Sequence, residues 1–214
     1  MATILVIGAS RGIGLESVRR ALAAGHRVRA FARGAAAIPV DAPALEKIAG
    51  DALDGADVAK ALGGADAVIQ SLGVSNGLQA VLSGTTLFSR ATRILIGAMR
   101  AAGVRRLVAV TGLGAGDSRG HGGFLYDALI FPLALKRIYD DKDVQEQMIK
   151  ASGLEWTIVR PGLLTSGPAT GQVRALTDRG EWRAGSISRA DVADFLVREA
   201  FECRFVGNTP LLIR

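Results

Sequence analysis

Hydrophobic positions along this chain fall into short runs that alternate with stretches of helical spacing. Residues 4–7 form a continuous apolar run, which is typical of a strand buried on both faces of a sheet. Between residues 13 and 22 the apolar residues recur at helical spacing, which indicates a helix. Gly8, Gly12 and Gly14 lie around the junction. The chain therefore begins with a predicted strand, a glycine-rich turn and a helix.

The same alternation continues along the chain. Further strands are predicted at residues 26–32, 44–49, 67–72, 106–111, 156–160 and 209–213, and further helices at residues 56–62, 85–102, 144–151 and 188–200. Residues 34–43 are rich in small residues and proline, so the helix expected there is short or absent. Strands that alternate with helices form right-handed βαβ units around a parallel sheet. We expect one doubly wound α/β domain over residues 1–214.

Composition narrows the class of protein. A chain of 214 residues that is 49% hydrophobic is long enough for one substantial core. No apolar run approaches the ~20 residues that cross a bilayer, and no secretory signal is evident at the N-terminus, so we expect a cytoplasmic protein with no membrane contact. Cys203 is the only cysteine and His26 and His121 are the only histidines, which argues against a disulfide and against a metal site.

The glycine-rich turn has a spacing that suits a dinucleotide. In such turns one glycine (here Gly8) permits the tight turn, a second (Gly12) lets backbone N–H groups approach the pyrophosphate, and a third (Gly14) lets the helix pack against the strand. The helix N-terminus then faces the negative charge. The net charge of +6 fits a polyanionic ligand of this kind. Nucleic acid is a poor fit, because the arginines are scattered and aromatic residues make up only 5%.

The residue after the second strand indicates which dinucleotide. Proteins that select NAD carry an acidic residue roughly 20 positions beyond the glycine turn, where it binds the ribose 2′-hydroxyl. Arg33 occupies that position, and the next acid is Asp41. A guanidinium grips a 2′-phosphate that a carboxylate would repel, and Arg11 lies where a second cation reaches the same group. The sequence therefore predicts NADP(H).

Two further strand ends have open interpretations. Asp51 follows the third strand, where a carboxylate either accepts from the adenine amino group or serves as a turn or cap residue. Gly73 follows Ser71 and Leu72 at the end of the fourth strand, where it either lets the backbone pass the ribose or simply ends the strand.

These residues, together with a longer motif, resemble a known family. Gly8–Gly14, Arg33, Gly50-Asp51, Thr111-Gly112 and the stretch Ser152-Gly-Leu-Glu-Trp-Thr-Ile-Val-Arg-Pro-Gly162 resemble the atypical short-chain dehydrogenase/reductases. The most similar groups are the NAD(P)H-binding NmrA-like proteins and the biliverdin-IXβ (flavin) reductases. The resemblance covers nearly the whole chain, including Ser188-Arg-Ala-Asp-Val-Ala193.

The resemblance implies a single Rossmann-like domain with NADP(H) across the carboxyl ends of the strands. It implies that Gly8, Ser10, Arg11, Gly12, Ile13 and Gly14 hold the pyrophosphate, that Arg33 binds the 2′-phosphate, that Asp51 with Ala52 or Leu53 lies by the adenine, that Leu72 and Gly73 lie by a ribose, and that Pro161, Gly162 and Leu163 lie by the nicotinamide. The substrate pocket is expected in the loops after strands five and six, at about residues 112–135 and 161–187.

The catalytic residues depart from the usual pattern. Typical members place a Ser or Thr after the fifth strand and a Tyr-x-x-x-Lys motif on the next helix, where the tyrosine exchanges the proton. Thr111 and Lys142 match the first and last of these, but Ile138 stands at the tyrosine position. Tyr139 is one residue out of register, and Tyr126 has Ile130 in place of a lysine. We expect Thr111 and Lys142 to be the catalytic residues and Tyr139 to be a packed aromatic.

The missing tyrosine favours acceptors that need no strong acid. The flavin and biliverdin reductases also lack the motif; a flavin or quinone takes hydride into a delocalised system and the proton comes from water. We expect NADPH-dependent reduction of a conjugated small-molecule acceptor by a monomer or homodimer. The alternative is a non-catalytic NADP(H)-binding redox sensor of the NmrA-like type. A sugar epimerase or dehydratase is disfavoured by the missing tyrosine and the short C-terminal region.

Overall fold

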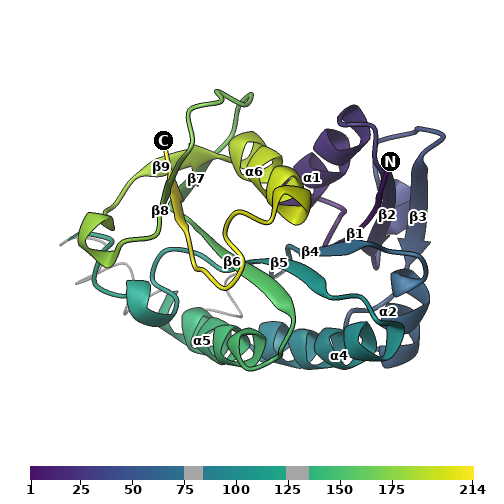
Figure 1. The fold of residues 1–214 in the computed structure, drawn as a ribbon, viewed down its shortest axis with the longest axis horizontal. Helices are drawn as coiled ribbons and strands as arrows, with labels where there is room; N and C mark the ends of the chain where they lie inside the picture. The colour runs from purple at the N-terminus through teal and green to yellow at the C-terminus, as the bar shows by residue number, and fades with distance from the viewer. Residues whose placement is uncertain (75–83, 124–134) are drawn as a thin grey trace.

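The computed structural model describes residues 1–74, 84–123 and 135–214. Its centre is an eight-stranded sheet in the order β3-β2-β1-β4-β5-β6-β10-β8 (Figure 1). The strands are β1 (Thr3–Ile7), β2 (Arg27–Ala32), β3 (Leu45–Ala49), β4 (Ala67–Gln70), β5 (Arg106–Val110), β6 (Glu155–Pro161), β8 (Arg174–Leu176) and β10 (Leu211–Ile213). Neighbouring strands are parallel from β3 to β10, and β8 is antiparallel to β10.

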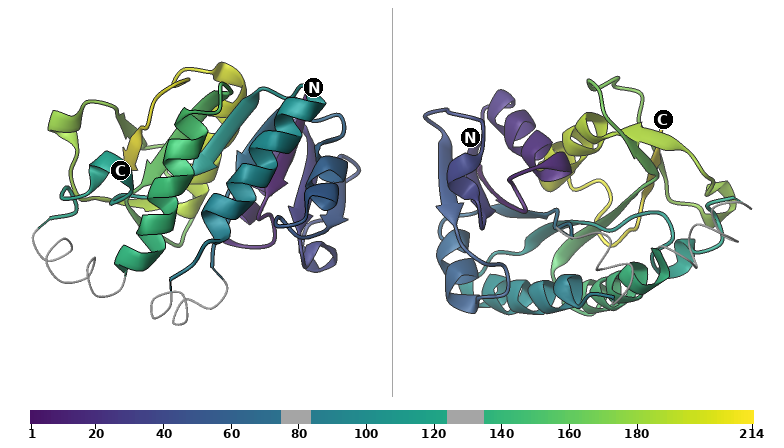
Figure 2. Two further views of the ribbon diagram at one scale, coloured as in Figure 1. Left: turned by 90° about the horizontal axis from the view of Figure 1, so that it is seen from below. Right: turned by 180° about the vertical axis from the view of Figure 1, so that it is seen from behind.

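Helices cover both faces of this sheet, which confirms the predicted doubly wound α/β fold. The helices α1 (Gly12–Ala23) and α6 (Arg189–Glu202) pack side by side on one face. The helices α2 (Gly55–Leu62), α4 (Leu87–Ala102) and α5 (Lys136–Lys150) cover the other face, as the views in Figure 2 also show. Strand β1 contributes to both cores, because Ile4 and Val6 face α1 and α6 while Leu5 and Ile7 face α2 and α4.

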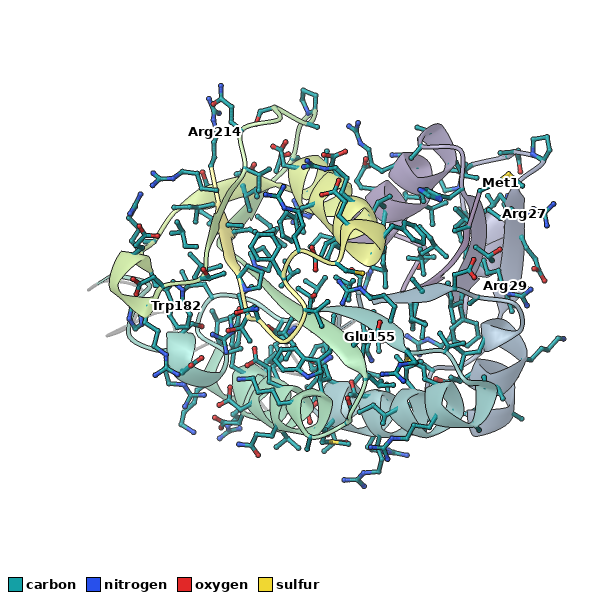
Figure 3. The ribbon with its side chains drawn as sticks, viewed as in Figure 1. Met1, Arg27, Arg29, Glu155, Trp182 and Arg214 are labelled. Carbon is teal, nitrogen blue, oxygen red and sulfur yellow. The ribbon has the colours of Figure 1, made fainter. Side chains whose placement is uncertain are left out.

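Several short elements complete the fold. Strand β7 (Leu163–Thr165) pairs in parallel with β9 (Ser186–Ser188) in a separate two-stranded sheet. Single turns of 3₁₀ helix lie at η1 (Ala35–Ala37), η2 (Gly116–Ser118) and η4 (Arg179–Glu181). The turn η1 is the only helical element between β2 and β3, which agrees with the predicted short or absent helix at residues 34–43. Trp182 follows η4 and anchors a small apolar cluster at the end of the molecule opposite Arg27 and Arg29 (Figure 3).

The sequence prediction was wrong in two places. The three-residue strands β7, β8 and β9 were not predicted, because a segment that short shows no measurable periodicity. The helix expected from residue 144 begins at Lys136 instead. The first half of this helix was not predicted, because its core-facing positions include the polar residues Asp141 and Lys142 and so lack a hydrophobic pattern.

In the described residues, no helix is long and apolar enough to cross a membrane.

Candidate functional site

A cavity of about 900 Å³ lies at the carboxyl ends of the parallel strands. It is lined by most of the residues that the sequence singled out: Gly8, Ser10, Arg11, Gly12, Ile13, Arg33, Asp51, Ala52, Leu53, Leu72, Gly73, Thr111, Lys142 and Pro161. The structure therefore gathers these residues at one edge of the sheet, where doubly wound proteins bind their ligands.

Three of the singled-out residues do not line this cavity. Gly14 lies behind the turn, and Gly162 packs closely on the backbone of Gly185. Leu163 is 72% exposed on β7, whereas its neighbour Leu164 lines the cavity. Successive side chains of a strand point to opposite sides, which accounts for the difference between the two leucines. Arg189, to which the sequence assigned no role, also lines the cavity.

The glycine-rich turn leaves a space that side chains would fill. A Cβ atom on Gly8 would lie 2.4 Å from the Ser71 carbonyl oxygen, and one on Gly14 would lie 2.1 Å from the Gly8 carbonyl oxygen. These two glycines are therefore required by close backbone packing. Gly12 has a φ of +57° and meets nothing within 4 Å, so its surroundings are open on the cavity side of α1.

The N-terminus of α1 suits an anionic group. Arg11 is the N-cap residue and gives no side-chain hydrogen bond to the helix, and the first turn contains no acidic residue. The first backbone N–H groups of the helix are thus not used by a side-chain cap, and they carry the positive end of the helix dipole. The Arg11 guanidinium lies at the same place and donates a hydrogen bond to the Val74 carbonyl over 3.1 Å.

The far end of the cavity is formed by the ends of β2 and β3. Arg33 follows β2 and is exposed on the rim. Asp51 follows β3, and its carboxylate accepts a hydrogen bond from the Leu53 N–H over 3.0 Å, while its own N–H donates to Asp57 over 2.9 Å. Asp51 therefore acts as a turn residue, one of the two interpretations that the sequence left open, and it still faces the cavity.

Lys142 lies at the other end of the cavity, and its side chain is buried. Its ammonium donates a hydrogen bond to the Thr111 carbonyl over 3.0 Å and sits 4.2 Å from the centre of the Phe88 ring. Burial lowers the pKa of Lys142 to about 8, and the nearby charges of Glu146 and Asp141 only partly offset this effect. The charged form of Lys142 therefore predominates at neutral pH, which lies a little below this pKa.

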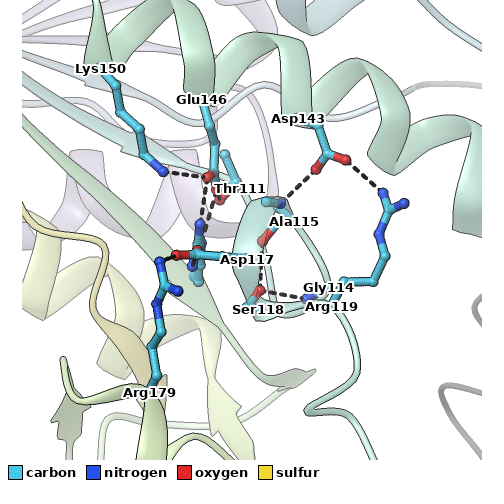
Figure 4. Close-up of polar contacts among 12 residues, drawn as sticks. Thr111, Gly114, Ala115, Asp117, Ser118, Arg119, Asp143, Glu146, Lys150 and Arg179 are labelled. Atoms are coloured by element: carbon cyan, nitrogen blue, oxygen red, sulfur yellow. Dashed lines mark hydrogen bonds and ion pairs between the residues drawn. The ribbon is translucent and has the colours of Figure 1, made fainter.

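The hydroxyl of Thr111 points into a buried ionic network. It donates to Glu146 over 2.8 Å (Figure 4). Glu146 is in turn held by Arg160 through hydrogen bonds of 2.6 Å and 3.0 Å. Arg160 also pairs with Asp117, and Asp117 pairs with Arg179 of η4. The Thr111 proton is thus directed away from the cavity, although the residue itself lines it.

Charges in this network are well compensated. Burial opposes the charge on Asp117, but the hydrogen bond and the charge of Arg160 hold the pKa of that carboxyl below its usual range. A Cβ on Gly116 would lie 2.6 Å from both the Arg160 guanidinium and the Glu146 carboxylate. The glycine loop after β5 therefore packs directly on the pair formed by α5 and β6.

The tyrosine that the usual motif requires is absent from its position. Ile138, four residues before Lys142, is buried against Phe88. Tyr139 is half-buried beside this pair, is not among the cavity-lining residues, and has its hydroxyl next to Gly112, where a Cβ would lie 2.5 Å from it. Tyr126 and Ile130 lie outside the described residues.

Comparison with known proteins gives the family. Residues 8–202 match the model of the NAD(P)H-binding family. The chain belongs to this family. A chloroplastic protein of Arabidopsis thaliana, At2g34460, described as uncharacterized, is 30% identical over 199 residues, which cover 91% of this chain and 70% of that protein. A Bacillus subtilis protein described as an uncharacterized sugar epimerase, YhfK, is 32% identical over 148 residues, which cover 66% of this chain and 59% of that protein.

Solved structures of similar fold include a reductase and a short-chain dehydrogenase/reductase. ChuY, an anaerobilin reductase of Escherichia coli O157:H7, superposes with a TM-score of 0.80 at 28% identity, covering 99% of this chain and 96% of that one. A short-chain dehydrogenase/reductase of Veillonella parvula, solved with NADP, has a TM-score of 0.80 at 15% identity, covering 100% and 94%, and shows the fold alone. The family match confirms the prediction that this chain binds a nicotinamide dinucleotide, and the solved structures confirm the predicted Rossmann-like fold.

Proposed function

We propose that this protein transfers hydride from NADPH to a conjugated acceptor such as a flavin or a quinone. The observation that carries the proposal is the ammonium of Lys142, which is buried against Thr111 at the end of the cavity, while Ile138 fills the place of the usual acid. The site thus offers a positive charge to the acceptor but no phenol at the usual position.

The residues around the cavity fit a dinucleotide phosphate. The open space at Gly12 and the α1 N-terminus, which lacks a side-chain cap, suit the pyrophosphate, which Gly8, Ser10, Arg11 and Ile13 would help to hold. The position of Arg33 on the rim supports a 2′-phosphate and hence NADP(H) rather than NAD(H). When bound, the nicotinamide supplies the hydride. Thr111, Lys142 and Pro161 then lie at the end where the nicotinamide and the acceptor would meet.

The protein's own contribution is orientation and charge. Reduction of a simple carbonyl builds negative charge on one oxygen, which a positioned acid must neutralise. In a flavin or quinone the charge spreads over the ring system, so a nearby ammonium is sufficient and water can deliver the proton. The Thr111 carbonyl and the Phe88 ring keep the ammonium of Lys142 in place. Of the segments in which the sequence placed the acceptor pocket, 161–187 contributes Pro161 and Leu164 to the cavity wall, none of residues 112–123 lines the cavity, and residues 124–134 lie outside the described residues.

The relatives support a reductase over the other interpretations. ChuY, at 28% identity, is described as a reductase. The missing tyrosine argues against transferring to this chain the sugar-epimerase description of the Bacillus subtilis relative. The buried ammonium of Lys142 at the cavity favours an enzyme over a non-catalytic sensor. Burying an ammonium costs free energy, and binding of a dinucleotide alone does not require one at this end of the cavity.

Oxidation of NADPH by the purified protein tests this function. FMN and a naphthoquinone should be reduced, whereas a simple aldehyde should not. Lys142→Met should lower turnover without abolishing NADPH binding, and Lys136→Met, an exposed lysine at the start of the same helix, is the matched control. Rapid reduction of aldehydes would contradict the choice of acceptor class.

A further inference from the structure

The cavity carries more positive than negative side chains. Among the described residues, its lining contains four cationic residues, Arg11, Arg33, Lys142 and Arg189, and one acidic residue, Asp51. Two of the cations, Arg11 and Arg33, are accounted for by the phosphates of a dinucleotide. Arg189 has no such assignment.

Arg189 is the first residue of α6 and is half-buried at the cavity wall. Its guanidinium makes a long hydrogen bond, of 3.4 Å, to the hydroxyl of Ser166. No carboxylate of the described residues forms an ion pair with it. Asp191, two residues further along the chain, instead accepts hydrogen bonds from the hydroxyls of Ser188 and Thr170. Within the described residues, therefore, most of the five N–H donors of Arg189 are not used by another side chain and can serve a ligand.

The neighbours of Arg189 place it at the acceptor end of the cavity. Ser166, which it contacts, and Leu164, which lines the wall with it, both belong to the segment that follows β6. In the sheet β6 is three strands from β1 and four strands from β2, whose ends carry Arg11 and Arg33. The guanidinium thus lies on the wall built by the segment after β6, while the two phosphate-assigned arginines follow β1 and β2.

We propose that Arg189 binds an anionic group of the acceptor, a carboxylate or a phosphate, and makes the protein select anionic conjugated acceptors. This inference rests on the proposed reductase function and specifies its substrate class. A planar guanidinium binds both groups through two parallel hydrogen bonds, and its withdrawal from bulk water strengthens the interaction.

Pairs of acceptors that share a ring system and differ by one anionic group test this proposal. FMN and riboflavin share one ring system and differ by a phosphate, and a naphthoquinone with and without a carboxylate provides the second pair. The KM for the anionic member should be lower by roughly tenfold or more, as for a charge-assisted pair of about 1.4 kcal/mol. Arg189→Ala should remove this difference by raising the KM for the anionic member alone. The Kd for NADPH and the KM for riboflavin should stay unchanged.

Three controls make the result decisive. Arg183→Ala removes an exposed arginine of the same segment that does not line the cavity, and it should change nothing. Arg189→Lys keeps the charge and should retain part of the preference, which separates recognition from a folding defect. Quenching of flavin fluorescence in the presence of NADP⁺ measures binding without turnover.

Each outcome has a definite meaning. An FMN preference in binding that depends on Arg189, without turnover of any acceptor, would contradict the reductase function and retain the anion site. Turnover with equal KM for charged and uncharged acceptors would overturn the anion site alone. Weaker NADPH binding in Arg189→Ala, with unchanged flavin binding, would also overturn it and assign Arg189 to the cofactor.

Discussion

Lys142 on α5 and Thr111 at the end of β5 are joined by a hydrogen bond of 3.0 Å from the lysine ammonium to the threonine carbonyl. The same threonine donates its hydroxyl to Glu146, one helical turn beyond the lysine. One residue of the sheet thus fixes two side chains of one helix. The ammonium is held at the cavity by backbone, so its position does not depend on a side-chain rotamer of Thr111.

The pH dependence follows from the burial of Lys142. Its pKa is lowered to about 8, so the charged form predominates below this pH and is lost as the pH rises through it. If the ammonium is needed, kcat/KM for NADPH, which reports the free enzyme, should be level below pH 8 and fall above it. Lys142→Arg should remove the fall, because a guanidinium stays charged. A wild-type profile that is flat to pH 10 would contradict the role of Lys142.

Substitution of the tyrosine should have a small effect. Tyr139 does not line the cavity, so Tyr139→Phe should change kcat by less than about tenfold, or 1.4 kcal/mol of barrier. A positioned acid would be worth roughly 10² to 10⁴. Lys142→Met should cost more than Tyr139→Phe. A loss of a hundredfold in Tyr139→Phe, with unchanged NADPH affinity, would show that this tyrosine supplies the proton.

Arg33 should set the choice of dinucleotide. NADPH is expected to bind at least ~10-fold more tightly than NADH, a difference of about 1.4 kcal/mol. Arg33→Ala should remove most of this preference and leave NADH affinity nearly unchanged, as measured by titration calorimetry. Arg27→Ala, an exposed arginine at the other end of β2, is the control. Equal wild-type affinities would contradict the assignment of Arg33.

The local parts of this architecture were predictable from the sequence. The β1–turn–α1 unit was found because strand, glycines and helix are consecutive, and Gly14 is required by its contact with Gly8 inside that unit. The end of β5 and Thr111 were placed from the continuous apolar run of that strand. These features depend on the order of residues and on short-range sterics.

The parts that depend on distant partners were not predictable. The polar inward face of α5 is stable only because Asp141 accepts from the backbone N–H of Phe88 and Glu146 pairs with Arg160. Arg189 reaches the cavity only because α6 packs beside α1. A signal for the first case was present in the sequence, since Lys142 and Glu146 are four residues apart on one helical face.

Two glycines of one turn should behave differently on substitution. Gly12→Val places a side chain where nothing lies within 4 Å, so the fold should persist, with some loss of stability from the φ of +57°, while cofactor binding is lost. Gly14→Ala places a methyl group against the Gly8 carbonyl and should lower the melting temperature. Circular dichroism and NADPH titration of both variants check this. Normal NADPH binding by Gly12→Val would place the dinucleotide elsewhere.

A single turnover under anaerobic conditions tests hydride transfer from NADPH to a flavin. Equimolar enzyme and NADPH are mixed with FMN in a stopped-flow instrument, and the absorbance of NADPH and of the oxidised flavin are followed together. Both absorbances should decay with one rate constant. This rate should fall with NADPH deuterated at one face of C4, and fall further in Lys142→Met. Tight NADPH binding with no decay in the presence of flavin, quinone or aldehyde would contradict the proposed function.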